Sequence, residues 1–163
     1  MRDNRMPKIT PFLWFDTQAE EAARFYTSLF KNSRITNVTH YSEGGPAPAG
    51  TVMVVSFELD GQAFSALNGG PQFNFTDAIS FAVDCDDQAE VDRLWNALTA
   101  DGGEPGQCGW LKDRFGVSWQ IVPRALYAML DDSDAVKVKR VTEAMLQMQK
   151  IDVPTLQAAY EQV

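Results

Sequence analysis

The chain has 163 residues, of which 45% are hydrophobic and 11% aromatic, enough for one domain with a sizeable core. Fourteen basic against twenty-two acidic side chains give a net charge of −8, and the densest basic stretch is Lys137-Val138-Lys139-Arg140. Nucleic acids and anionic membranes require a concentrated positive surface, so neither is expected as a partner.

The N-terminal region shows no targeting signal. The opening MRDNRMPK is charged, and the apolar run that follows, residues 9–15, is too short for a signal-peptide core or a membrane span. The two cysteines, Cys85 and Cys108, form no CxxC pair, which favours reduced thiols. We therefore expect a cytoplasmic protein. Met6 is an equally good start, so residues 1–5 are expected to be a loose tail.

The first half of the chain predicts a strand, an amphipathic helix and three more strands. Apolar residues recur at helical spacing after Asp16 or Thr17, either of which suits the N-cap position. Asp60-Gly61 is a strong two-residue hairpin signal between two alternating stretches. In chain order, the predicted elements are a strand at 9–15, a helix at 18–30, a strand at 33–41, a loop at 42–50 and strands at 52–59 and 62–67.

The second half repeats this order. A strand is predicted at 79–84, a helix at 88–98 with Asp86 or Asp87 as its N-cap, and a weak strand near 104–107. Three matches in the same order indicate an internal duplication. They pair Leu13-Trp14-Phe15-Asp16 with Phe81-Ala82-Val83-Asp84, Gln18-Ala19-Glu20 with Gln88-Ala89-Glu90, and Arg24-Phe25-Tyr26-Thr27-Ser28-Leu29 with Arg93-Leu94-Trp95-Asn96-Ala97-Leu98.

The stretch from Cys108 to Val122 reads as a hairpin whose connection is Asp113-Arg114-Phe115-Gly116. Gly116 suits a left-handed conformation, and Asp113 is expected to bond its own backbone. Alternation places one partly polar set of residues, Ser118, Gln120 and Val122, opposite the set Val117, Trp119 and Ile121. The polar face is either solvated or lined by a bound molecule.

We therefore expect an α+β fold of two tandem βαβββ modules, about 7–70 and 77–123, forming one domain over 7–123. Two such halves would enclose a trough between their sheets. Residues 124–163 are expected to be a C-terminal helical extension of the same domain. The extension is predicted as a short helix at 124–130, a helix after Asp132-Ser133-Asp134 and a last helix after Asp152. Its stripe of Val138, Val141, Met145 and Met148 packs on the body or on a partner subunit, or covers the trough.

Three stretches resemble the PhnB-like branch of the glyoxalase/bleomycin resistance/dioxygenase (vicinal oxygen chelate) superfamily, often labelled 3-demethylubiquinone-9 3-methyltransferase. They are ITPFLWFDTQAEEAARFYTSLF, FELDGQAFSALNGGPQF and, most specific, CGWLKDRFGVSWQIVP. The similarity covers roughly residues 7–150. It implies the duplicated fold and a homodimer as the expected assembly.

The resemblance also implies where a metal would be held. The superfamily's ligand positions correspond here to Thr10 or Pro11, to Ala78 and to Gln120. Hard divalent ions need anionic or imidazole donors, so we expect no metal and no other cofactor. The only histidine, His40, has no acidic or thiol neighbour at metal-ligand spacing.

Residues able to reach the trough are the candidate ligand-binding residues. Ser118, Gln120 and Asn68 offer hydrogen bonds, and Trp14 and Trp110 offer aromatic surface, although each also suits a structural role. The leading hypothesis is a small-molecule-binding protein without metal. One alternative is a lyase, isomerase or dioxygenase whose metal is held by other groups such as Asp16, Glu58 or Glu104, or an enzyme without metal. The other is a scaffold dimer without a ligand. The methyltransferase of the family label ranks last, because no glycine-rich turn joins a strand to a helix.

Overall fold

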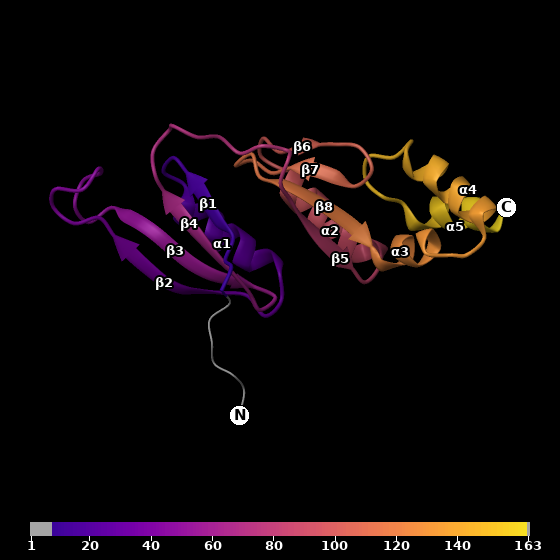
Figure 1. The fold of residues 1–163 in the computed structure, drawn as a ribbon, viewed down its shortest axis with the longest axis horizontal. Coiled ribbons are helices and arrows are strands. Elements are labelled where there is room, and N and C mark those ends of the chain that lie inside the picture. The colour runs from indigo at the N-terminus through magenta and orange to yellow at the C-terminus, as the bar shows by residue number, and fades with distance from the viewer. Residues whose placement is uncertain (1–7, 163) are drawn as a thin grey trace, which may run out of the picture. The chain divides into compact units, whose positions relative to one another are not determined.

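The structure, a computed structural model, describes residues 8–162. The loose tail expected at residues 1–5, and Met6, lie outside the described residues. The chain forms two compact units, one ending at Asn74 and the other beginning at Phe75. Each unit is described by itself below (Figure 1).

The first unit is a four-stranded sheet with one helix. Its strand order is β1-β4-β3-β2, with β1 parallel to β4 and the other neighbours antiparallel. Val55, Phe57 and Phe64 are buried with the apolar residues of α1, which packs on β3 and β4. The elements are β1 (Phe12–Phe15), α1 (Ala19–Leu29), β2 (Arg34–His40), β3 (Val52–Leu59) and β4 (Gln62–Asn68).

The predicted cap of α1 was wrong. Gln18, not Asp16 or Thr17, holds the N-cap position, and its side chain makes no capping bond. The N–H of Ala19 instead donates to Oδ1 of Asn68 at 2.8 Å, from the end of β4. A residue distant in sequence thus satisfies one of the unpaired donors at the helix start. The first strand also begins later than expected, at Phe12 rather than Ile9.

The second unit repeats the arrangement. Its strand order is β5-β8-β7-β6, with β5 parallel to β8. Asp87 caps α2 as predicted, accepting a hydrogen bond from the Glu90 N–H. The elements are β5 (Ser80–Cys85), α2 (Gln88–Thr99), β6 (Glu104–Pro105), β7 (Trp110–Lys112) and β8 (Ser118–Pro123). The predicted α+β fold of two βαβββ modules is confirmed, because corresponding strands take the same places in both sheets.

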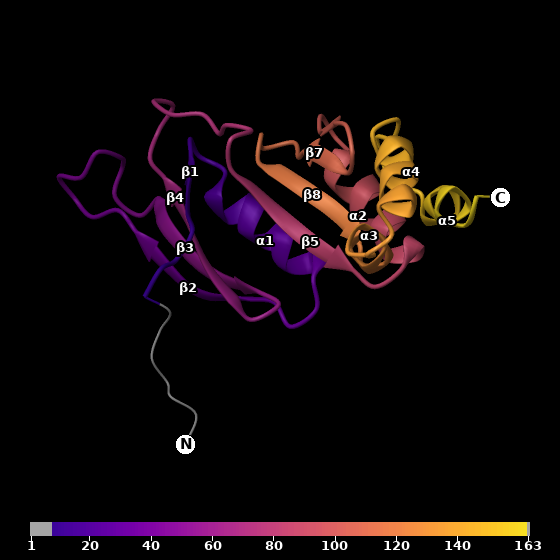
Figure 2. The same cartoon turned by 45° about the vertical axis from the view of Figure 1, so that its right-hand side comes forward.

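Three helices, α3 (Arg124–Leu130), α4 (Ala135–Met145) and α5 (Val153–Glu161), follow β8 and complete the second unit (Figure 2). Asp134 and Asp152 cap α4 and α5, as predicted. Met148 of the predicted stripe lies beyond the end of α4, and its carbonyl accepts the Cys108 N–H at 2.8 Å. The extension is thus joined by backbone bonds to the loop before β7.

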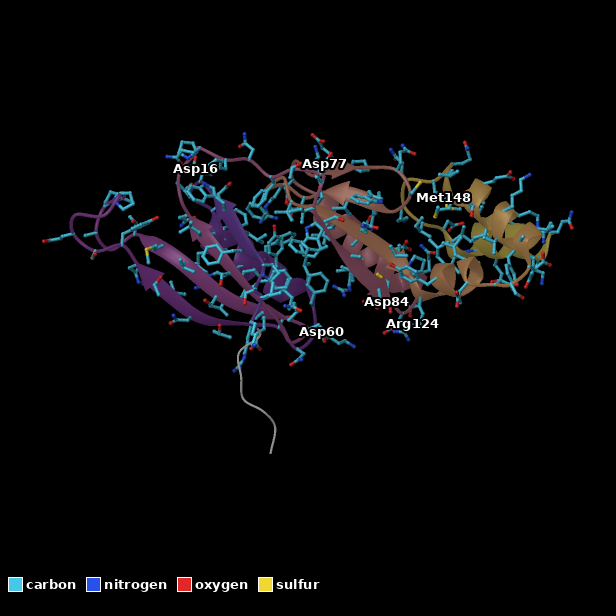
Figure 3. The ribbon with its side chains drawn as sticks, viewed as in Figure 1. Asp16, Asp60, Asp77, Asp84, Arg124 and Met148 are labelled. Atoms are coloured by element: carbon cyan, nitrogen blue, oxygen red, sulfur yellow. The ribbon has the colours of Figure 1, made fainter. Side chains whose placement is uncertain are left out.

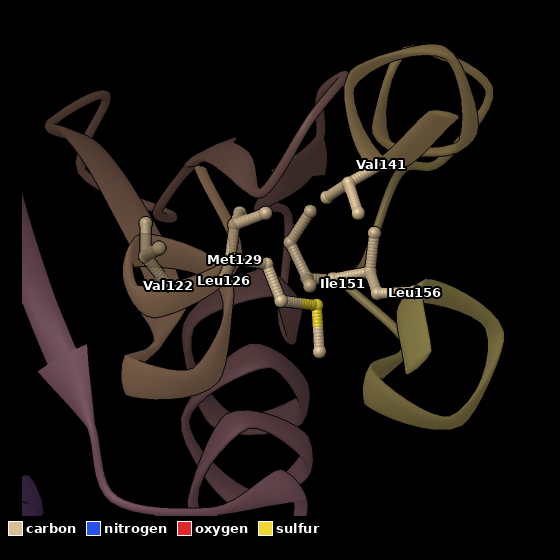
Figure 4. Close-up of a cluster of buried hydrophobic side chains, with 6 residues drawn as sticks. All are labelled: Val122, Leu126, Met129, Val141, Ile151 and Leu156. Atoms are coloured by element: carbon tan, nitrogen blue, oxygen red, sulfur yellow. The ribbon is translucent and has the colours of Figure 1, made fainter. Parts of the chain in front are cut away.

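A hydrophobic cluster holds these helices to the sheet (Figure 4). Val122 at the end of β8 joins residues from all three helices and from the α4–α5 connection. Val141 of the apolar stripe therefore packs on the body of the chain, which was one of the two alternatives. The cluster members are Val122, Leu126, Met129, Val141, Ile151 and Leu156.

We predict that Ile151, in the connection between α4 and α5, stabilises the second unit. Ile151 is fully buried and packs beside Gly109, so Ile151→Ala should lower the free energy of unfolding by about 2–4 kcal/mol. Chemical denaturation followed by circular dichroism measures this loss. Leu146→Ala, at an exposed position of the same extension, is the control and should cost within about 0.5 kcal/mol. An Ile151→Ala loss as small as the control's would contradict the prediction.

Candidate functional site

Two rows of side chains share one face of the second sheet. Register pairs Trp110 of β7 with Gln120 of β8, and Gln120 with Ala82 of β5. Two residues further along the strands, register pairs Lys112 with Ser118, and Ser118 with Ser80. Since side chains alternate across a strand, all six point to the same side. We call this set of six residues the open face.

The opposite side of this sheet is core. Leu111, Trp119, Ile121 and Cys85 share it by the same alternation, and all four are buried. Helix α2 packs on β5, β7 and β8 and covers that side. Burial raises the pKa of the Cys85 thiol to about 12, so this cysteine is a packed apolar group rather than a nucleophile.

One row of the open face contains the exposed indole of Trp110, and the other row contains only polar side chains. Trp110 is 38% exposed, and Ala82 is exposed as well. Gln120 donates from Nε2 to the Ser80 hydroxyl at 2.9 Å, which joins the two rows. Ser118, only 3% exposed, donates to Oδ1 of Asp77 at 3.2 Å, and the Lys112 ammonium lies 3.3 Å from the same oxygen. The face thus combines an aromatic surface with amide, hydroxyl and ammonium groups.

The buried carboxylate of Asp113 sets the position of the hairpin strands. Its Oδ1 accepts the N–H groups of Phe115 and Val117 at 2.9 and 3.0 Å, and its Oδ2 accepts Trp119 Nε1–H at 2.9 Å. The Gly116 N–H bonds the Asp113 carbonyl, and Gly116 has φ +90, as the Asp-x-x-Gly pattern predicted. The expected turn role of Asp113 is confirmed, with the bond to Trp119 as an addition.

The other two candidate residues, Trp14 and Asn68, belong to the first unit. Trp14 Nε1 donates to the Gly70 carbonyl at 2.9 Å, and its ring lies so close to Gly69 that a Cβ there would be 2.3 Å away. Asn68 caps α1 with Oδ1 and donates from Nδ2 to the Val52 carbonyl at 3.1 Å. Both side chains therefore have structural roles in the loop and helix start beside β4.

The residues at the superfamily's metal positions do not fit a divalent ion. Thr10 and Ala78 are exposed positions before β1 and β5, and Gln120 offers a neutral amide already bonded to Ser80. His40 is exposed on the edge strand β2. Within residues 8–162, His, Cys, Asp and Glu form no group of three that could hold a metal. The side chains at these positions therefore lack the anionic or imidazole donors that a bound divalent ion would need.

Sequence reasoning missed three members of the open face and the carboxylate bonded to it. Ser80, Ala82, Lys112 and Asp77 were not among the candidates, although Ser80 and Ala82 lie within the strand predicted at 79–84 and Lys112 within the predicted hairpin. Asp77 precedes β5 in a turn, where an acidic residue reads as ordinary surface. Only the parallel pairing of β5 with β8 brings residues 77 and 80 beside residues 118 and 120.

Comparisons with known proteins give the family. The family model described as 3-demethylubiquinone-9 3-methyltransferase matches residues 7–122. A PhnB protein from Bacillus cereus that bears the same methyltransferase name is 39% identical, with a TM-score of 0.66 over 72% of this chain and 99% of that one. No curated protein matches the chain.

Two more distant structures share the fold. A Pseudomonas aeruginosa protein is 24% identical with a TM-score of 0.59, over 72% of this chain and 98% of that one. The fosfomycin resistance protein FosX from Listeria monocytogenes is 15% identical with a TM-score of 0.51, over 81% of this chain and all of that one. In the part of the chain that the structure describes, every helix is too short or too polar to cross a membrane.

Two βαβββ modules, together with these matches, define a glyoxalase/bleomycin resistance-like protein of the vicinal oxygen chelate superfamily. Within that class, the chain belongs to the PhnB-like family that carries the name 3-demethylubiquinone-9 3-methyltransferase. The resemblance stated from the sequence motifs is therefore confirmed.

We predict that Asp113→Asn destabilises the protein by about 1–3 kcal/mol. The amide would turn either a donor or a weaker acceptor toward three N–H groups in a site that is 2% exposed. Urea denaturation measures the change, and Asp101→Asn, at an exposed left-handed position that Asn tolerates, is the control.

A double-mutant cycle with Trp119→Phe locates the cause. If the Trp119 bond carries part of the loss, Asp113→Asn should cost less in the Trp119→Phe background than in the wild type. Full additivity of the two changes would contradict this assignment.

Proposed function

We propose that the protein binds a small molecule on the open face of the second sheet and that it does so without a metal ion. The supporting observation is the register that sets Trp110 beside Gln120 and Lys112 beside Ser118 on one accessible side of the sheet. Binding sites of this kind combine apolar or aromatic surface with a few placed polar groups.

The amide of Gln120 is central to the proposal. At this position the superfamily's enzymes carry a metal-ligating glutamate, as the resemblance implies, whereas a glutamine keeps the hydrogen-bonding shape and loses the charge. A neutral amide beside an exposed indole suits orientation of a planar ligand by stacking and hydrogen bonds. It does not suit the retention of a divalent cation.

The rival proposals rest on fewer observations. An enzyme whose metal is held by Asp16, Glu58 or Glu104 is the alternative, and Glu58 already pairs with Arg34 at 3.4 Å. A methyltransferase would need a site for its methyl donor, and neither sheet is doubly wound around a glycine-rich turn. Assembly as a homodimer and a cytoplasmic location remain predictions.

We predict that the purified protein carries less than stoichiometric Zn, Mn, Ni and Fe after mild dialysis, because its ligand positions lack anionic or imidazole donors. Elemental analysis of the dialysed protein measures this. Gln120→Glu is the comparison variant, since it restores one anionic donor and should increase metal uptake if it changes it at all. One equivalent of any of these metals retained by the wild type would overturn the metal-free proposal.

We predict that at least one compound in a broad thermal-shift library raises the melting temperature through Trp110. Stabilisation follows from binding to the folded state alone, and is about 2.7 kcal/mol at a hundred times the dissociation constant. Trp110→Ala should abolish the shift, while Tyr127→Ala, at another exposed aromatic residue of the same unit, should preserve it.

Two results would count against binding at the open face. A library without a single stabilising compound would favour the scaffold alternative. A shift that survives Trp110→Ala would place the ligand elsewhere. For a stabilising compound, Gln120→Glu should weaken binding, and an accompanying change in turnover of that compound would favour an enzyme.

A further inference from the structure

We propose that the ligand of the open face is a planar molecule carrying a carboxylate-like anionic group, and that Asp77 occupies the place of this group in the ligand-free chain. This inference rests on the proposed function, because it names the ligand class of the same site. It assigns Lys112 and Ser118 as the anion subsite and Trp110 as the surface for the planar part.

Two donor groups converge on the Asp77 carboxylate. One oxygen, Oδ1, receives both the Ser118 hydroxyl at 3.2 Å and the Lys112 ammonium at 3.3 Å. A hydroxyl and an ammonium that converge on one carboxylate oxygen form a site for a carboxylate. Asp77 itself comes from the turn before β5 and lies at the surface (Figure 3).

The two donor residues belong to the sheet, whereas Asp77 lies in a turn outside it. Lys112 and Ser118 are register partners in the β7–β8 ladder, and Ser118 is 3% exposed. The Asp77 side chain is 66% exposed and that of Lys112 is 42% exposed. An ion pair so accessible to water contributes little to stability, so an incoming carboxylate can replace Asp77 at small cost.

The spacing of the open-face residues suits a planar anion. Lys112 lies two residues from Trp110 on one strand, so their attachment points are about 7 Å apart along the sheet face. A fused aromatic ring with one carboxylate spans a comparable length. Gln120 lies beside Trp110 and Ser118 beside Lys112, and the bond from Gln120 to Ser80 connects the two rows. The Gln120 amide would therefore contact polar atoms at the planar end of the ligand.

The charge of Asp77 should limit the binding of anionic ligands at Lys112. Lys112 and Asp77 together are neutral, and the chain as a whole carries −8, so an anion gains attraction here only when the Asp77 carboxylate withdraws. Removal of that carboxylate leaves the Lys112 ammonium without the ion-pair partner that it has in the structure. The affinity for anionic ligands should then rise, while the affinity for neutral ligands should stay the same.

The test compares 2-naphthoate with its neutral analogue 2-naphthamide. Binding of each is followed by NMR on the Trp110 indole N–H signal, assigned with Trp110→Phe, at low ionic strength. We expect the wild type to bind the carboxylate at least threefold more tightly than the amide. Asp77→Asn should raise the affinity for the carboxylate by roughly three- to tenfold and leave that for the amide unchanged.

Two further variants isolate the charges. Lys112→Gln should remove the preference for the carboxylate, since it removes the cation and keeps most of the side-chain length. Asp86→Asn is the matched control: its carboxylate is also exposed and ion-paired, to Arg124 at 2.9 Å, and it should leave both affinities unchanged.

The possible results separate this inference from the proposed function. Equal affinities for the two probes, or no gain from Asp77→Asn, would overturn the anion subsite while leaving binding at Trp110 intact. The anion subsite would also be overturned if neither probe bound while a library compound still bound through Trp110. Absence of any Trp110-dependent ligand would overturn the proposed function itself.

Discussion

The carboxylate of Asp113 is the interaction on which the site depends. It is 2% exposed and receives two backbone N–H groups of its own turn and the indole N–H of Trp119. A buried carboxylate that receives these N–H groups holds its turn in one conformation, since the loss of any one of them weakens the stabilisation of its charge. The conformation of this turn determines which β7 residue faces which β8 residue. A slip of one residue would move the open-face side chains to the core side.

The duplicated modules solve the same local problem in different ways. Asn68 and Pro123 hold corresponding places, each paired with the last residue of the first strand of its module. Asn68 caps the helix of the first module, whereas proline has no side-chain acceptor, and α2 is capped by its own Asp87. The C-terminal helices then begin directly after Pro123 and bury Val122. The second module has therefore gained a helical extension at the place where the first has a capping amide.

The open face shows how the inherited fold takes on a different chemistry. The position where the resemblance implies a metal-ligating glutamate carries a neutral glutamine, Gln120, which is bonded to Ser80. Beside it are an exposed indole and an ammonium–carboxylate pair that water can reach. On these residues rests the proposal that a ligand is oriented by stacking, by hydrogen bonds and by replacement of a carboxylate. The rigid ladder between β7 and β8 supplies the preorganisation that such a site requires.

Much of this architecture followed from local sequence. Alternation, the Asp60-Gly61 hairpin, the Asp87, Asp134 and Asp152 caps and the repeated motifs predicted the elements and their duplication, because turn and capping chemistry acts over a few residues. The same alternation put Ser118 and Gln120 on one face. Tertiary structure alone decided what those side chains meet. Asn68 reached α1 from β4, and Asp77 and Ser80 reached Ser118 and Gln120, only through the pairing of strands far apart in the chain. Such pairings depend on the packing of whole sheets, which no short stretch of sequence contains.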